Sequence, residues 1–201
     1  MSYLEFIGTV FNLACVWLVS INLWINWPIG IIGSTLFLIL FYQIRLYSDF
    51  IEQIYYIITG FIGWYLWFNP TKNRKKEELK ISNSSKESNL IYLLAISLGS
   101  LFLTILIVKI HIILPNFFPE EASFPFMDAF TTILSFCATI LMTKRKIDCW
   151  YLWITVDVIG VFLYFAKGVV FVSLLYFLFL ILAIRGFINW KKILFSYAED
   201  N

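Results

Sequence analysis

The sequence predicts an all-α integral membrane protein with seven transmembrane helices, in which two like-oriented three-helix units flank one connecting helix. Three observations support this fold class. The chain has 201 residues, of which 61% are hydrophobic and 14% are charged, whereas soluble domains contain about 45 to 50% apolar residues. Seven apolar segments are each long enough to cross a hydrocarbon layer of about 30 Å as a helix. Aromatic residues and glycines also recur at a fixed spacing in the first and last parts of the chain.

The seven predicted helices follow one another along the sequence. The start of the chain lacks the basic region of a secretory signal, so the first segment is expected to be a retained helix. It closes with indoles and asparagines, which are typical of the membrane interface. Pro28 then stands where the start of a helix tolerates proline. The predicted helices cover residues 6–25, 29–47, 49–68, 90–114, 126–142, 148–165 and 169–190.

A hydrophilic stretch divides the chain. Residues 71–89 are rich in Lys, Glu, Ser and Asn and show no apolar period, which indicates a solvated linker. The segment after it lacks the aromatic and polar faces of its neighbours, so we expect a connector helix. The predicted division is a first three-helix unit at 1–69, a cytoplasmic linker at 70–89, a connector helix and loop at 90–123, and a second unit with a short cytoplasmic tail at 124–201.

A spacing of 123 residues relates two pairs of predicted helices. Trp27 corresponds to Trp150, Phe41 to Tyr164, Gly63 to Gly186 and Trp67 to Trp190. Because these matches need no gap, they indicate a duplicated three-helix unit. One helix between the units gives both the same orientation, which is the parallel type of transporter repeat.

Lys and Arg are unevenly divided between the two ends of the predicted bundle. Of the 15 such residues, Arg45, Lys109 and Lys167 fall on the side of the N-terminus, and the others fall on the side of the C-terminus. Cytoplasmic loops carry the excess of Lys and Arg. We therefore expect the N-terminus outside and the C-terminus in the cytoplasm, in a multi-pass protein of the cytoplasmic (inner) membrane.

The sixth predicted helix has an aromatic and acidic face. Trp150, Trp153, Asp157, Gly160 and Tyr164 recur at steps of three and four, so they share one side of the helix. An ionisable group in the middle of a membrane costs at least ~2.5 kcal/mol and normally faces the interior of a bundle or a water-filled cavity. This face is therefore expected to line the inside of the protein.

The third predicted helix has a second such face. Its members are Asp49, Gln53, Tyr56, Gly60, Trp64 and Trp67. Two units of this kind leave a cavity at their interface. Indoles and phenols suit a flat, partly polar or cationic molecule, because a cation over an indole gains about 0.5 to 2 kcal/mol. Gln53 and Asp157 are candidates for hydrogen bonds to hydroxyl groups.

Other interpretations of these residues remain open at this stage. Trp24, Trp27, Trp67 and Trp190 stand at segment ends, where indoles also form an interfacial belt. Asp157 is also compatible with a structural acceptor or with a proton carrier. A structural or assembly subunit is the alternative from another class, and it predicts inward faces that pack without a cavity.

Enzyme, metal and nucleic-acid functions are not indicated. The sequence contains no G-x-S-x-G, no H-E-x-x-H, no phosphate-binding glycine loop and no Cys–His arrangement. Cys15, Cys137 and Cys149 are far apart in apolar runs, which predicts neither a zinc site nor a disulfide framework. A net charge of +2 is too small to suggest a nucleic-acid partner. We expect no catalytic residue, cofactor or metal.

Several motifs identify a family resemblance. They are NWPIGIIG at 26–33, LYSD at 46–49 with Gln53, GWYLW at 63–67, W-x-x-W at 150–153, VD at 156–157 and Y-x-x-KG at 164–168. Together they closely resemble PnuC-type nicotinamide riboside transporters. The resemblance covers nearly the whole chain outside the linker and the connector helix. Two positions depart from the pattern: Cys149 stands where such carriers often have Asn, and Glu52 precedes Gln53.

The resemblance implies a function and an architecture. It implies a three-plus-one-plus-three fold like that of the SWEET sugar transporters, with a central site. It further implies facilitated diffusion of nicotinamide riboside, trapping of that substrate by a cytoplasmic kinase, and a homotrimer. Thiamine, or another flat vitamin such as riboflavin, is the alternative substrate within the same fold. The predicted substrate-binding residues are Trp150, Trp153, Asp157, Gln53, Tyr56, Trp64, Tyr164 and Asn22.

Overall fold

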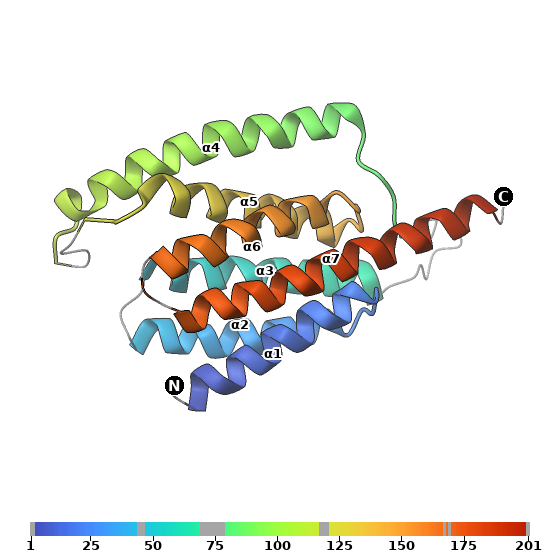
Figure 1. The fold of residues 1–201 in the computed structure, drawn as a ribbon, viewed down its shortest axis with the longest axis horizontal. Coiled ribbons are helices and arrows are strands. Elements are labelled where there is room, and N and C mark those ends of the chain that lie inside the picture. Colours follow the sequence, from blue (N-terminus) through green and yellow to red (C-terminus); the bar gives the residue numbers. More distant parts are fainter. Residues whose placement is uncertain are drawn as a thin grey trace.

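Seven α-helices make up nearly all of the chain that the structure describes. The computed structural model describes residues 3–43, 47–68, 79–116, 121–166, 168 and 170–199. The helices are α1 (Tyr3–Ser20), α2 (Asn26–Gln43), α3 (Tyr47–Phe68), α4 (Lys86–Ile113), α5 (Pro125–Thr143), α6 (Cys149–Ala166) and α7 (Val170–Glu199). They lie side by side along one common direction (Figure 1). The predicted all-α fold class is confirmed.

Length and composition make most of these helices suitable for crossing a membrane. Six helices, α1, α2, α4, α5, α6 and α7, are long and apolar enough to do so. The helix α3 is not among the six, although it has 22 residues and a helix of that length spans about 33 Å. Asp49, Glu52 and Gln53 lie in its first turns and lower its hydropathy. In Figure 1 it lies inside the bundle, alongside the other helices.

Four helices differ in extent from the sequence prediction by three residues or more. The helix α1 ends at Ser20 rather than near residue 25, and α2 begins at Asn26 rather than at residue 29. The helix α4 begins at Lys86 rather than near residue 90, because the Ser85 side chain accepts a hydrogen bond of 3.1 Å from the Ser88 N–H and so caps the helix. The helix α7 continues to Glu199 rather than ending near residue 190. Its added turns carry apolar side chains that pack against the hydrophobic core, including Leu194 and Tyr197.

The helices pack as two equivalent units. In the first unit α1 contacts α2 and α2 contacts α3, and in the second unit α5 contacts α6 and α6 contacts α7. The units meet through two contacts, α1 with α7 and α3 with α5, which exchange under the 123-residue repeat. Among the described helices, α4 packs only against α5, on the outside of the bundle (Figure 1). This is the predicted parallel repeat with one connector helix.

Four indoles form a tryptophan cluster where the two units meet, made of Trp27, Trp67, Trp150 and Trp190. All four belong to one hydrophobic core cluster. Within the first unit the rings of Trp27 and Trp67 meet edge to face, with centroids 5.4 Å apart, and within the second unit Trp150 and Trp190 do the same at 5.5 Å. The membrane-interface interpretation is wrong for Trp67 and Trp190, which are 6% and 0% exposed.

Two glycines explain why the repeat retains the same residues in this cluster. A Cβ atom at Gly63 would overlap the indole of Trp27, and a Cβ atom at Gly186 would overlap the indole of Trp150. Each glycine therefore lets a bulky ring lie directly against the backbone of the neighbouring helix. The spacing of 123 residues thus conserves a packing arrangement rather than isolated residue types.

The part of the predicted linker that the structure describes is docked rather than solvated. Residues 79–84 pair with the turn between α5 and α6: the Ser82 N–H donates to the Arg145 carbonyl at 3.1 Å, and the Ile147 N–H donates to the Ser82 carbonyl at 3.0 Å. Ile81 is only 2% exposed. The prediction of a solvated linker is therefore wrong for this stretch, and the earlier part of the linker lies outside the described residues.

Candidate functional site

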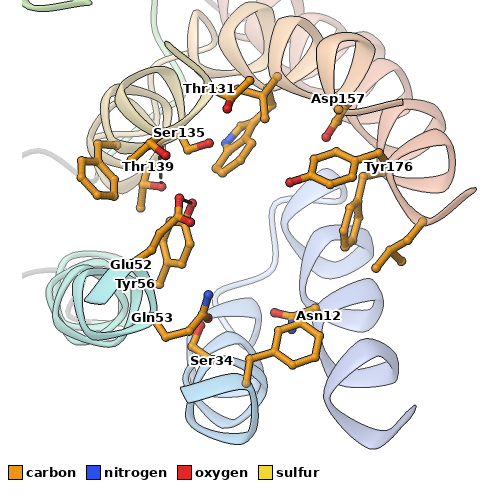
Figure 2. Close-up of a pocket in the computed structure, with 18 of the residues that line it drawn as sticks. Asn12, Ser34, Glu52, Gln53, Tyr56, Thr131, Ser135, Thr139, Asp157 and Tyr176 are labelled. Atoms are coloured by element: carbon orange, nitrogen blue, oxygen red, sulfur yellow. Dashed lines mark hydrogen bonds between the residues drawn. The ribbon is translucent and has the colours of Figure 1, made fainter. Parts of the chain in front are cut away.

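A cavity of about 1260 Å³ lies between the two units. It extends from the first turns of α1 and α5, where Glu5 and Asp128 line it, to the tryptophan cluster, where Trp27 and Trp150 line it. The cluster closes that end. Figure 2 shows polar side chains from both units around an open centre. Inward faces without a cavity, which the structural-subunit hypothesis predicted, are not observed.

Six of the eight predicted substrate-binding residues line this cavity. They are Gln53, Tyr56, Trp150, Trp153, Asp157 and Tyr164. The other two do not line it. Asn22 lies in the turn between α1 and α2, with a positive φ of 59°. Trp64 is partly buried and packs against the hydrophobic core cluster that contains the four indoles.

The aromatic and acidic face of α6 is turned toward the cavity over its whole length. All five residues of that face, from Trp150 to Tyr164, line the cavity. Asp157 is 4% exposed, and Figure 2 shows its carboxylate directed into the cavity near the ring of Tyr176. No hydrogen bond or ion pair joins Asp157 to any other residue that the structure describes. An unpartnered buried carboxylate is costly and calls for a cationic or hydrogen-bonding ligand.

The opposite side of the cavity is formed by α3. Gln53 is 7% exposed and lines the cavity with Glu52 and Tyr56. The Tyr56 hydroxyl donates a hydrogen bond to Glu52 Oε1 at 2.9 Å, which is the i, i+4 spacing that brings side chains together on a helix. Sequence reasoning noted Glu52 only as a departure from the family pattern. Its position four residues before Tyr56 was the available signal.

The charged side chains in the described part of the cavity lining all have one sign. Glu5, Glu52, Asp128 and Asp157 line it, and no Lys, Arg or His belongs to its described lining. The carboxylates are dispersed: the described residues contain no group of three or more His, Cys, Asp or Glu that could hold a metal ion. A cleft lined by one sign of charge attracts ligands of the opposite sign. The site therefore suits a cation and disfavours an anion.

The sequence of this chain is similar to those of several known proteins. Residues 2–192 match the family model described as nicotinamide mononucleotide transporter. The chain is 31% identical to the nicotinamide riboside transporter PnuC of Escherichia coli (strain K12) over 207 residues, covering 94% of this chain and 85% of that protein. It is 25% identical to the nicotinamide riboside transporter PnuC of Neisseria mucosa, covering 96% of this chain and 73% of that protein.

More distant similarities extend this comparison. The riboflavin/roseoflavin transporter RibM of Streptomyces davaonensis is 21% identical over 169 residues, covering 84% of this chain and 75% of that protein. The crystal structure of the vitamin B3 transporter PnuC superposes with a TM-score of 0.70 at 23% identity, covering 96% of this chain and 82% of that chain. This likeness supports the fold. Because the family model spans nearly the whole sequence and a curated relative is 31% identical, this chain belongs to the PnuC family of membrane transporters.

Proposed function

We propose that this protein carries nicotinamide riboside across the membrane through the cavity between its two units. The observation that carries this proposal is the lining itself, which combines aromatic rings with four carboxylates and, among the described residues, no cationic side chain. Nicotinamide riboside is a flat pyridinium cation joined to a neutral sugar. Its two parts match the aromatic, acidic and hydroxyl-binding groups of this lining.

The same lining favours the riboside over the mononucleotide named in the family description. A phosphate monoester carries about −1.5 to −2 charges at pH 7. Among the described lining residues such a group would meet carboxylates and no basic side chain, and a neighbouring like charge disfavours a charged group. We therefore propose that the phosphorylated form is excluded.

The proposed binding residues have distinct roles. Trp153 provides the ring surface for the pyridinium, and Asp157 provides the opposite charge. Gln53 and Tyr164 supply hydrogen bonds from the two units. Trp150 is 1% exposed, so its proposed role is to close the cavity beneath the ligand. These assignments rest on the lining of the cavity and on the family's substrate.

Transport is proposed to proceed by alternating access, as in other transporters with two repeated units. No ion or nucleotide site is required, because a cytoplasmic kinase that phosphorylates the riboside traps it as an anion. Downhill flux then continues. We also propose that the chain assembles as a homotrimer, as the family resemblance implies.

The proposed location is the cytoplasmic membrane, with the N-terminus outside. Among the described residues, Lys109 lies in the last turns of α4, which end on the side of the N-terminus (Figure 1), and the other Lys and Arg residues lie before or at the start of α4, between α5 and α6, or in the second half of α7. Under the positive-inside rule the side that holds these other residues is cytoplasmic. The proposed units are residues 1–69 and 124–201, separated by the linker at 70–89 and the connector at 90–123.

Counterflow in liposomes tests the proposed function. Purified protein should accelerate exchange of labelled nicotinamide riboside above the rate of empty vesicles, and unlabelled riboside should compete while the mononucleotide should not. Thiamine and riboflavin are the comparison competitors, and we expect neither to match the riboside, since the PnuC relatives described above are named for the riboside. Exchange no faster than in empty vesicles would contradict the proposal.

A further inference from the structure

The internal repeat shows which parts of the cavity are alike in the two units and which part differs. Near its outer end, Glu5 and Thr9 of α1 have the acidic and hydroxyl counterparts Asp128 and Thr132, which lie 123 residues later in α5, and all four line the cavity. At the inner end, the counterpart of Trp27 is Trp150. Both ends of the cavity are thus alike in the two units.

The middle of the cavity is not alike in the two units. Lining residues related by 123 positions differ there in charge, polarity or size. The pairs are Gly30 with Trp153, Ser34 with Asp157, Glu52 with Leu175, Gln53 with Tyr176, and Tyr56 with Phe179. Each unit contributes one carboxylate, but at non-equivalent positions. A site that is symmetric at both ends and asymmetric in the middle suits a ligand with two unlike ends.

The two carboxylates of the middle have different surroundings. Asp157 lies with Trp153 on one face of α6, and Figure 2 shows it on the side of the cavity formed by the second unit. Glu52 lies across the open centre, on α3, beside Tyr56. Asp157 thus accompanies aromatic rings, whereas Glu52 accompanies hydrogen-bonding groups.

A hydrogen bond from Tyr56 orients the carboxylate of Glu52. The Tyr56 hydroxyl donates to its Oε1 at 2.9 Å. An ionised carboxylate has about four acceptor sites, so it binds several donors at once. Two hydroxyls on adjacent carbons are such donors, and in dinucleotide sites a carboxylate accepts a hydrogen bond from the ribose 2′-hydroxyl. The arrangement suits a sugar more than a pyridinium, which has no donor on its ring nitrogen.

We infer that Glu52 is a specificity-determining residue that binds the adjacent 2′- and 3′-hydroxyls of the substrate's ribose, while the pyridinium faces Trp153 and Asp157 of the second unit. This inference rests on the proposed function. It fixes the direction of the ligand across the cavity, with the sugar toward α3 and the ring toward α6. Tyr56 is a positioning residue for this contact.

Changing the ligand and the protein in combination tests the inference. Affinities are measured for nicotinamide riboside and for its 2′,3′-dideoxy analogue, with wild-type protein and with Glu52→Gln, both in lipid nanodiscs. Wild-type protein should bind the riboside roughly tenfold to 100-fold more tightly than the analogue, which is the size expected for hydrogen bonds to a charged group. In Glu52→Gln this ratio should fall to roughly threefold or less. Glu52→Leu, which copies the counterpart Leu175, should abolish it.

The matched control is Asp157→Asn, which should weaken both ligands equally and keep the wild-type ratio. If Glu52→Gln weakens the affinity for both ligands equally, so that their ratio is unchanged, the assignment of Glu52 is overturned. Thermal unfolding of each variant shows whether the fold is retained, and a merely structural effect would leave the ratio unaltered. If wild-type protein binds neither ligand, the proposed function itself is overturned, and the assignment with it.

Discussion

The indoles of Trp67 and Trp190 lie 5.9 Å apart at the junction of the two units, and each donates its N–H to a backbone carbonyl of the opposite unit. Trp67 bonds to the Thr143 carbonyl at 3.1 Å, and Trp190 bonds to the Val19 carbonyl at 3.0 Å. The two acceptors lie at the ends of α5 and α1, which correspond in the repeat. The inner end of the cavity is therefore closed by a nearly two-fold pair of hydrogen bonds.

Removing one of these donors should destabilise the protein. Trp190→Phe retains an aromatic ring but removes one hydrogen bond to the Val19 carbonyl, which keeps its bond from the Asn22 N–H at 2.9 Å, so the loss costs about 0.5 to 1.5 kcal/mol. We expect a lower thermal unfolding temperature in detergent, and the same for Trp67→Phe. The control is Trp17→Phe, because Trp17 is 43% exposed. Equal unfolding temperatures for the Trp190 and Trp17 variants would show that the hydrogen bond contributes nothing.

Adding a methyl group beneath the tryptophan cluster should be more damaging. In Gly186→Ala the new Cβ overlaps the Trp150 indole, and overpacking of this kind costs about 1 to 3 kcal/mol or more. Gly63→Ala should act in the same way through Trp27. The matched control is Gly99→Ala, whose Cβ would come within 3.3 Å of the Ile133 side chain, a much smaller conflict. Yield of monodisperse protein and its unfolding temperature provide the measurement, and a Gly186 variant that behaves like the Gly99 variant would contradict the packing argument.

Helical spacing predicted which side of each helix faces inward, but not how far along the helix the cavity extends. Trp64 belongs to the predicted face of α3, one turn after Gly60, which does line the cavity. At the level of Trp64 the space is already filled by the tryptophan cluster. Asn22 lies beyond the cluster for the same reason, since Val19 already contacts Trp190. The depth of the cavity along a helix depends on how the other helices pack. The periodicity of a single helix contains no information on that depth.

Glu52 lines the cavity although the predicted face of α3 did not include it. It lies about 100° around the helix from Gln53, at the edge of the predicted face. At the level of Glu52 the cavity is wide enough that three successive residues of α3, from Ile51 to Gln53, all line it. A periodic pattern selects a narrow stripe and therefore omits residues that become accessible where helices diverge. The repeat, in contrast, was predictable, because the same packing of an indole against a glycine requires the same residue at Trp27 and Trp150.

Truncating the proposed ring-binding residue should affect affinity rather than folding. Trp153 is partly buried and lines the cavity, so Trp153→Ala removes a surface for the pyridinium. Loss of a cation–π contact worth about 0.5 to 2 kcal/mol predicts roughly a twofold to 30-fold weaker affinity for nicotinamide riboside, measured by isothermal titration. Phe162→Ala is the control, because Phe162 is 70% exposed. A collapse of thermal stability with unchanged affinity in the folded fraction would identify Trp153 as a packing residue.

Neutralising Asp157 should reduce the preference for a cation. Dihydronicotinamide riboside has nearly the same shape as the riboside but no positive charge on its ring, so the two ligands differ in the interaction that Asp157 is proposed to make. A charged hydrogen bond or ion pair of this kind is worth about 1.5 to 3 kcal/mol. Wild-type protein should therefore prefer the oxidised form by roughly tenfold or more, and Asp157→Asn should bind the two forms about equally. Retention of the full preference in the variant would place the counter-charge elsewhere in the cavity.

Freeing the docked linker should open the end of the bundle that carries the tryptophan cluster. Arg145 connects the two, since its guanidinium donates to the Leu79 carbonyl at 2.5 Å and lies 4.3 Å from the Trp67 ring centre. Arg145→Ala removes the hydrogen bond to Leu79 and the cation–π contact with Trp67, together worth about 1 to 2.5 kcal/mol, so local opening should become roughly fivefold to 70-fold more frequent. Cys149 is fully buried beside this cluster, and its rate of labelling by a hydrophilic maleimide, in a background of Cys15→Ser and Cys137→Ser, measures that opening. Lys144→Ala, at an exposed neighbouring position, is the control, and equal labelling rates in the two variants would show that Arg145 does not hold this end closed.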